Sequence, residues 1–99
     1  MITTHVLDTA RGRPASRIPV RLERDGETLA DTVTGADGRA RLTDDAAPGR
    51  YSLVFDTDSY LGGTGFYPEV TIVFEVADAG HYHVPLLLSP FGYSTYRGS

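Results

Sequence analysis

Short runs of β-branched and aromatic residues make up most of the sequence, and no segment keeps a helical period for long. Turn-forming residues separate these runs. Within residues 18–23, every second side chain is apolar: Ile18, Val20 and Leu22. Such alternation is typical of a strand with one buried face. Asp25-Gly26 follows directly and is a strong signal for a two-residue β-hairpin, so residues 28–34 are predicted to be the partner strand.

The same pattern recurs along the chain and predicts about eight strands. They are expected at residues 2–7, 18–23, 28–34, 39–42, 51–57, 69–76, 82–89 and 93–97. Strands of this length and spacing predict an all-β fold, an antiparallel β-sandwich with two sheets. Residues 58–61 allow one short helical turn, because Gly62-Gly63 and Gly65 oppose a longer helix.

Three pairing predictions follow from the individual runs. The strand at 51–57 carries apolar residues on both faces, which predicts a central position in its sheet. The strands at 69–76 and 82–89 are separated by a short turn at 77–80, so we expect them to pair with each other in antiparallel fashion. Pro85 lacks a backbone N–H, which predicts that its strand lies at a sheet edge or contains a bulge.

Length and composition bound the function. At 99 residues, the chain is expected to form one domain, residues 1–99. A net charge of -4 argues against nucleic acid and anionic membranes as partners. The absence of cysteine removes thiolate nucleophiles and cysteine-based zinc sites. The segment MITTHVLD lacks the features of a signal peptide, and no apolar run is long enough to cross a bilayer, so we expect a cytoplasmic protein.

Three histidines are the first candidates for chemistry. His81 and His83 form an H-x-H pair, and in a strand both side chains point to one face. His5 lies on the first strand. Three interpretations remain open from the residues alone. These are ordinary surface histidines, a zinc site, or a pair that orients and deprotonates water near neutral pH.

Arg39 and the last residues of the chain are the other candidates. Arg39 follows the tight Asp37-Gly38 turn, where a rigid guanidinium could bind carboxylate or carbonyl oxygens. Tyr93, Tyr96 and Arg97 crowd around Ser99, so we expect the end of the chain to lie in a site. No serine is followed or preceded by the pattern of a nucleophile elbow, and the glycines form no phosphate-binding pattern.

Three segments resemble one family from end to end. They resemble the 5-hydroxyisourate hydrolases, the transthyretin-related enzymes of urate degradation. The segments are THVLDTARGRPA, TGADGRA and HYHVPLLLSPFGYSTYRGS. The ending Tyr96-Arg97-Gly98-Ser99 is the specific part, because transthyretin itself shares the fold but not this tetrapeptide. His5 is a second mark of the enzymes.

The resemblance implies a function and a site. It implies catalytic roles for His5, Arg39 and His83, and substrate binding by Tyr96, Arg97, Gly98 and Ser99. His83 is chosen because it precedes Val84-Pro85, whereas His81 is left out. The family implies a homotetramer with active sites between subunits, with 5-hydroxyisourate as substrate and neither metal nor organic cofactor. The alternative is a non-enzymatic transthyretin-type protein that binds a small ligand.

One segment departs from the family pattern. Where the family has a helix of about two turns before its F-[FY]-P motif, residues 58–65 are shorter and rich in glycine. Phe66-Tyr67-Pro68 then resumes the pattern. The departure touches no proposed catalytic position, so we expect it to affect loop packing more than chemistry.

Overall fold

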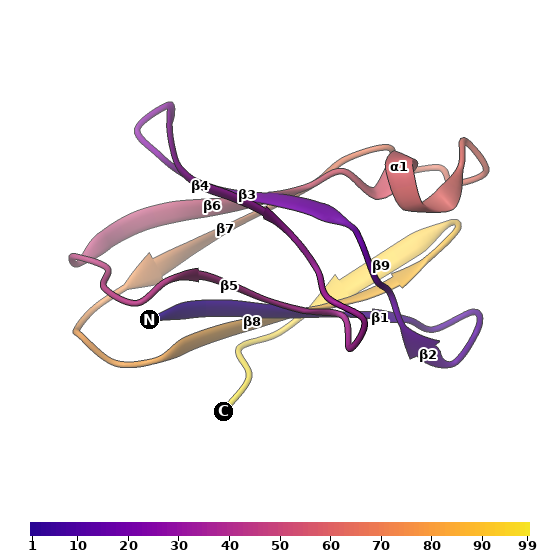
Figure 1. Ribbon diagram of the computed structural model, residues 1–99. Coiled ribbons are helices and arrows are strands. Elements are labelled where there is room, and N and C mark those ends of the chain that lie inside the picture. Colours follow the sequence, from indigo (N-terminus) through magenta and orange to yellow (C-terminus); the bar gives the residue numbers. More distant parts are fainter.

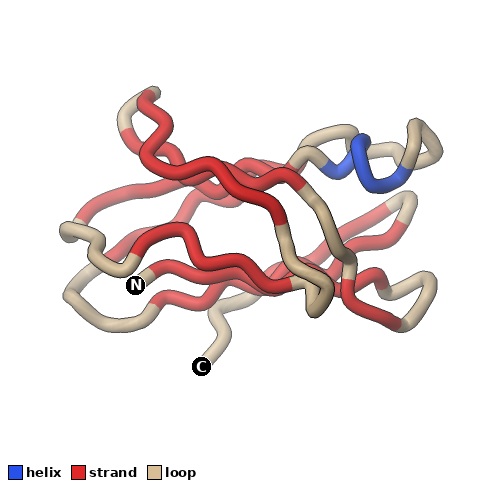
Figure 2. Tube along the Cα trace, in the orientation of Figure 1, coloured by secondary structure: helices blue, strands red, loops and turns tan.

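Two β-sheets face each other across a single core in the computed structural model, which describes residues 1–99 (Figure 1). The elements are β1 (Ile2–Asp8), β2 (Arg13–Pro14), β3 (Pro19–Arg24), β4 (Glu27–Val33), β5 (Arg39–Thr43), β6 (Gly49–Phe55), α1 (Thr57–Leu61), β7 (Val70–Val76), β8 (Tyr82–Ser89) and β9 (Gly92–Thr95). The predicted all-β sandwich is confirmed, with the two-residue β2 as an additional strand. Figure 2 shows how little of the chain is helical.

The sheets differ in strand order. One has the order β4-β3-β6-β7, so β6 is central, as its two apolar faces predict. The other has the order β2-β1-β8-β9, and β5 pairs with β1 as well. Within this five-stranded sheet β1 and β8 are parallel, from Ile2 opposite Tyr82 to Asp8 opposite Leu88. All other strand pairs are antiparallel.

The predicted pairing of the strands at 69–76 and 82–89 is wrong. β7 pairs with β6, whereas β8 belongs to the other sheet and pairs with β1 and β9. The connection crosses between the sheets and is held by the hydroxyl of Tyr82, which accepts hydrogen bonds from the backbone N–H groups of Ala77 and Asp78 and donates one to Asp78 Oδ1. Apolar alternation reports which face is buried, but it does not report which sheet a strand joins.

Pro85 also lies elsewhere than predicted, since β8 is an interior strand between β1 and β9. The β8–β9 ladder begins at Leu86 opposite Thr95, directly after the proline. Proline is tolerated there because the missing N–H lies beyond the end of that ladder. No bulge is found between β8 and either neighbour.

Inward-facing residues of both sheets form one core of 18 buried side chains. On β1 the inward residues Ile2 and Val6 are fully buried, while the outward residues Thr3 and His5 are half-buried. Every buried side-chain oxygen and nitrogen has a hydrogen-bond partner. The alternation of β1 therefore commits one face to the core and leaves the other face of the sheet for polar residues.

The predicted helical turn is confirmed as α1. Asp56 caps it by accepting a hydrogen bond from Ser59 N, and Gly62 ends it in a left-handed conformation. No helix in the structure has the length and apolar character needed to span a membrane.

The turn before β5 depends on Gly38. Its φ of +78° lies in the left-handed region, and a Cβ atom built on it would lie 2.5 Å from Val6 O and 3.0 Å from Pro14 Cβ. Gly38 O in turn accepts a hydrogen bond from Val6 N at 2.8 Å. Glycine is required here both for backbone conformation and for the close approach of two chain segments.

We predict that Gly38→Ala lowers the free energy of unfolding by about 2–3 kcal/mol, because it combines an unfavourable φ with a steric clash. Denaturant unfolding at a fixed protein concentration measures the loss. Gly26→Ala is the matched control: Gly26 has the same φ of +78°, but a Cβ atom at that position would have nothing within 4 Å of it. Equal losses in the two variants would contradict the role of the contact with β1.

Candidate active site

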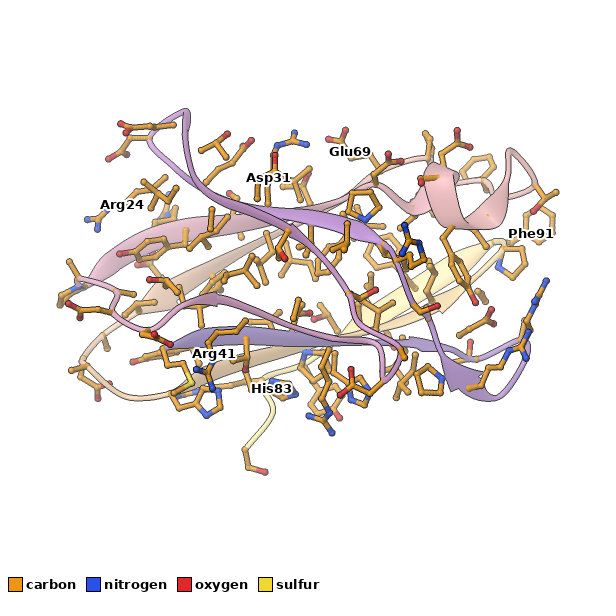
Figure 3. The ribbon with its side chains drawn as sticks, in the orientation of Figure 1. Arg24, Asp31, Arg41, Glu69, His83 and Phe91 are labelled. Carbon is orange, nitrogen blue, oxygen red and sulfur yellow. The ribbon has the colours of Figure 1, made fainter.

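The outer face of the five-stranded sheet gathers the polar residues that the sequence singles out. Parallel pairing places Thr3 opposite His83, and antiparallel pairing with β5 places His5 opposite Arg39. Three strands thus bring His5, Arg39 and His83 to neighbouring positions on one sheet. In Figure 3, His83 and Arg41 lie on the side of this sheet away from the four-stranded sheet, where the end of the chain also passes.

A cavity of about 380 Å³ opens on this face. Most of its wall is polar or charged; it is lined by Met1, Thr3, Thr4, Asp37, Arg39, Ala40, Arg41, His81, His83 and Ser99. Arg39, His83 and Ser99, predicted from the sequence, are therefore brought together. His5 does not line this cavity, but it lies close enough to act electrostatically on His83.

Thr3 connects two histidines. Its Oγ1 lies 2.7 Å from His83 Nδ1 and 2.7 Å from His81 Nε2. His81 is thus part of the same polar cluster, although the sequence prediction left it out. The signal was present in the H-x-H spacing, which predicts that both rings project to one face.

The pKa of His83 is lowered from its ordinary value. Burial of the ring is the largest cause, followed by the positive charge of Arg39 and then by His81 and His5. Both effects disfavour the imidazolium form. His83 is therefore held neutral near pH 7 and can accept a proton, as a general base must.

Arg39 is held by its turn. Asp37 Oδ1 accepts a hydrogen bond from Arg39 N at 3.0 Å, and Asp37 Oδ2 lies 4.0 Å from Arg39 Nε. The guanidinium remains largely exposed to the cavity. Arg41 projects from the same strand face and adds a second cation that the sequence prediction missed.

Gly98 fits closely against His83. Its N–H donates to His83 O at 2.8 Å, which forms an isolated antiparallel bridge between the tail and β8. A Cβ atom at position 98 would lie 2.5 Å from His83 Cδ2 and 3.3 Å from Pro85 Cγ. Because Thr3 already holds the other side of the imidazole, the ring has little room to move aside. Glycine at this position lets the chain end pack directly on the histidine.

Tyr96 and Arg97 point into a different space. Both line a neighbouring groove of about 150 Å³ together with Tyr82 and Phe74, and His83 lines both this groove and the main cavity. The Arg97 guanidinium carbon lies 4.4 Å from the centre of the Tyr82 ring, in cation–π geometry. Within one chain, the main cavity therefore receives Ser99 but not the side chains of Tyr96 and Arg97.

No group of three or more histidine, cysteine, aspartate or glutamate side chains is arranged to hold a metal ion. His81 and His83 instead share one hydroxyl oxygen. The donor set on this face is therefore suited to hydrogen bonding and to binding anionic or carbonyl oxygens.

Comparison with known proteins shows which family this chain is related to. Residues 2–98 match the HIUase/Transthyretin family. The chain belongs to this family. It is 50% identical to a 5-hydroxyisourate hydrolase of Mesorhizobium japonicum, over 99% of this chain and 91% of the relative. That alignment spans 113 positions, more than the 99 residues here, so the relative is longer within the matched region.

Two solved structures show how closely the family fold is kept. The 5-hydroxyisourate hydrolase of Klebsiella pneumoniae superposes with a TM-score of 0.90 at 39% identity, covering 99% of this chain and 92% of that one. Transthyretin of Sparus aurata superposes with a TM-score of 0.88 at 32% identity, covering 98% and 95%. The family resemblance stated from the sequence is confirmed, and so is the transthyretin-like fold.

We predict that Arg39→Met raises the pKa of His83 towards its ordinary value, because the substitution removes the largest electrostatic cause of the lowered pKa and keeps a long side chain. Titration of the ring nitrogens by NMR measures it. Arg50→Met is the control, because Arg50 pairs with Glu75 on the other sheet. An unchanged His83 titration in Arg39→Met would contradict the electrostatic role of Arg39.

Proposed function

We propose that this protein hydrolyses 5-hydroxyisourate to 2-oxo-4-hydroxy-4-carboxy-5-ureidoimidazoline, a step of urate degradation. The observation that carries the proposal is a neutral histidine beside an arginine in one polar cavity. The family membership supports it, because curated relatives from bacteria and mouse are named 5-hydroxyisourate hydrolases. A cytoplasmic location remains a prediction from the sequence.

His83 is the proposed base for the attacking water. Its Nδ1 is engaged by Thr3, so Nε2 is the nitrogen left to take a proton. The lowered pKa keeps this nitrogen unprotonated near neutral pH. His5, opposite Arg39 on the adjacent strand, is proposed to help orient the water or the substrate.

Arg39 is the proposed electrophilic partner. A fixed guanidinium can bind a substrate carbonyl and stabilise the negative charge that develops on its oxygen when water attacks. Asp37 and the Gly38 turn fix the backbone from which Arg39 projects. No part of this chemistry requires a cofactor.

The tail completes the proposed substrate site. Ser99 lines the cavity, and Gly98 packs on the base, so both act within one chain. Tyr96 and Arg97 line the neighbouring groove, which His83 also lines, and there they are proposed to bind the part of the substrate that extends past the base. These four roles follow the family resemblance and stand as proposals.

A transthyretin-type carrier is the less well supported alternative. Small-molecule carrier sites are mostly apolar, whereas this cavity is lined mainly by threonine, histidine, arginine and aspartate side chains. The sea bream transthyretin in complex with thyroxine shares the fold at 31% identity, which does not separate the two functions. The chemistry of the cavity wall favours hydrolysis.

Hydrolysis is tested by generating 5-hydroxyisourate with urate oxidase and following its ultraviolet absorbance. The wild-type protein is expected to accelerate the decay well above the spontaneous rate. His83→Gln should lower kcat by about 10²–10⁴-fold, since it removes the base. Arg39→Met should lower it by about 10²–10³-fold, since it removes charge stabilisation. Arg50→Met serves as a control with full activity. Decay at the spontaneous rate with wild-type protein would refute the function.

We also propose a homotetramer with active sites between subunits. β9 is an edge strand, and the aromatic side chains around it are uncovered, with Phe91 77% exposed and Tyr96 58% exposed. Exposed aromatic groups of this kind are typical of subunit contacts. Light scattering should give the mass of four 10.7 kDa chains. A fully active monomer would contradict sites shared between subunits.

A further inference from the structure

We propose that Thr3 and His81 form a proton relay that carries a proton from His83 to solvent, an inference that rests on the proposed hydrolytic function. The hydroxyl of Thr3 contacts one ring nitrogen of each histidine at 2.7 Å. The two ring centres are 6.0 Å apart, so the hydroxyl is the link between them. Membership of the family does not by itself assign a role to His81 or Thr3.

The direction of the two hydrogen bonds follows from the chemistry of a hydroxyl group. A threonine hydroxyl has one proton to donate, so it donates to one histidine and accepts from the other. Because Nε2 of His83 is the proposed base, the proton of the neutral ring is on Nδ1. The chain therefore runs from His83 Nδ1–H to Thr3 Oγ1, and from Thr3 O–H to His81 Nε2.

The solvent exposure of the side chains increases from the His83 end of the hydrogen-bonded series to the His81 end. His83 and Thr3 are half-buried, whereas His81 is exposed at the edge of the cavity. The charge of Arg39 opposes storage of a proton on His83. The other cations near the cluster are Arg41 and the Met1 amino group at the cavity, and Arg97, whose Nη2 lies 3.5 Å from His81 O. Asp37 and the chain end at Ser99 line the same cavity, and His5 on β1 acts electrostatically on His83. A proton that reaches His81 is therefore at the solvent-exposed end of the hydrogen-bonded chain.

The reaction supplies a proton that must leave. Water forms a C–O bond to the ring carbonyl carbon and the C–N bond of the ring breaks. One water proton ends on the leaving nitrogen, which becomes part of a neutral ureido group. The carboxylic acid of the product is fully ionised at neutral pH, so the second proton is released. For each neutral substrate hydrolysed, one proton has to pass from the site to solvent.

In the relay, His83 Nε2 first takes a proton from the attacking water, and only after the ring C–N bond has broken does Nδ1 give its own proton to Thr3. Thr3 passes its proton to His81 Nε2, and His81 releases a proton from Nδ1 to solvent. His83 is only half-buried, but substrate bound in the cavity would cover Nε2, so the route left for the proton runs through Nδ1 and Thr3. The parallel register between β1 and β8 holds Thr3 beside His83 without a flexible loop.

Steady-state kinetics in dilute buffer without imidazole test the relay. Thr3→Val keeps the shape of the side chain and removes the hydroxyl, and His81→Ala removes the acceptor. Both are expected to lower kcat by about tenfold or more, because proton export becomes limiting. The kcat/KM values should stay within about twofold, because export follows the first irreversible chemical step. Added imidazole should restore kcat in His81→Ala, and Thr3→Ser should recover most of the rate. Thr28→Val, on the other sheet, is the control for the substitution itself.

An unchanged kcat in Thr3→Val and His81→Ala would overturn the relay, and so would a loss in His81→Ala that imidazole does not restore. NMR of the ring nitrogens separates this outcome from failure of the proposed function, because it needs no substrate. The relay requires His83 protonated on Nδ1 in the wild type and a loss of that preference in Thr3→Val. Protonation on Nε2 in the wild type would overturn the relay, whereas absence of wild-type hydrolysis would overturn the proposed function.

Discussion

The parallel pairing of β1 with β8 is the interaction on which the rest of the structure depends. It joins segments about 80 residues apart in the chain, with a continuous register from Ile2–Tyr82 to Asp8–Leu88. A shift of one residue would turn every side chain of a strand to the opposite face. The register therefore buries Ile2 and Val6 in the core and places Thr3 beside His83 on the outer face at the same time. Folding and assembly of the site are consequences of one pairing.

Two glycines bring the remaining groups to that face. Gly38 lets the turn before β5 approach β1, so that Arg39 emerges opposite His5. Gly98 lets the tail bond to the backbone of His83 and pack against its ring. The resulting cluster contains more cations than carboxylates, which would destabilise a charged imidazole. Burial of the His83 ring is the largest cause of its lowered pKa and the charge of Arg39 adds to it, which suits the ring to act as a base.

The fold was largely predictable because the alternation of apolar residues and the Asp25-Gly26 turn are local signals. The partner of β8 was not, since five residues after β7 can close a hairpin or cross to the other sheet, and the hydroxyl of Tyr82 favours the crossing. The family resemblance located Arg39 and His83, which the cavity brings together. Two features depend on cross-strand geometry that no single segment of sequence contains. One is the inclusion of His81 in the cavity wall, and the other is the position of Tyr96 and Arg97 in a neighbouring groove.

The central claim is that a neutral His83 on the outer face of the sheet acts as the base. The pH dependence of kcat/KM for 5-hydroxyisourate tests it most directly, because this profile reports ionisations of the free enzyme. Lowering the pH protonates His83, so the rate should fall on the acid side with an apparent pKa below the ordinary 6.5 of histidine, matching the NMR titration of that ring. An acid limb at or above 6.5, or a rate that does not change between about pH 5 and 8, would contradict the account.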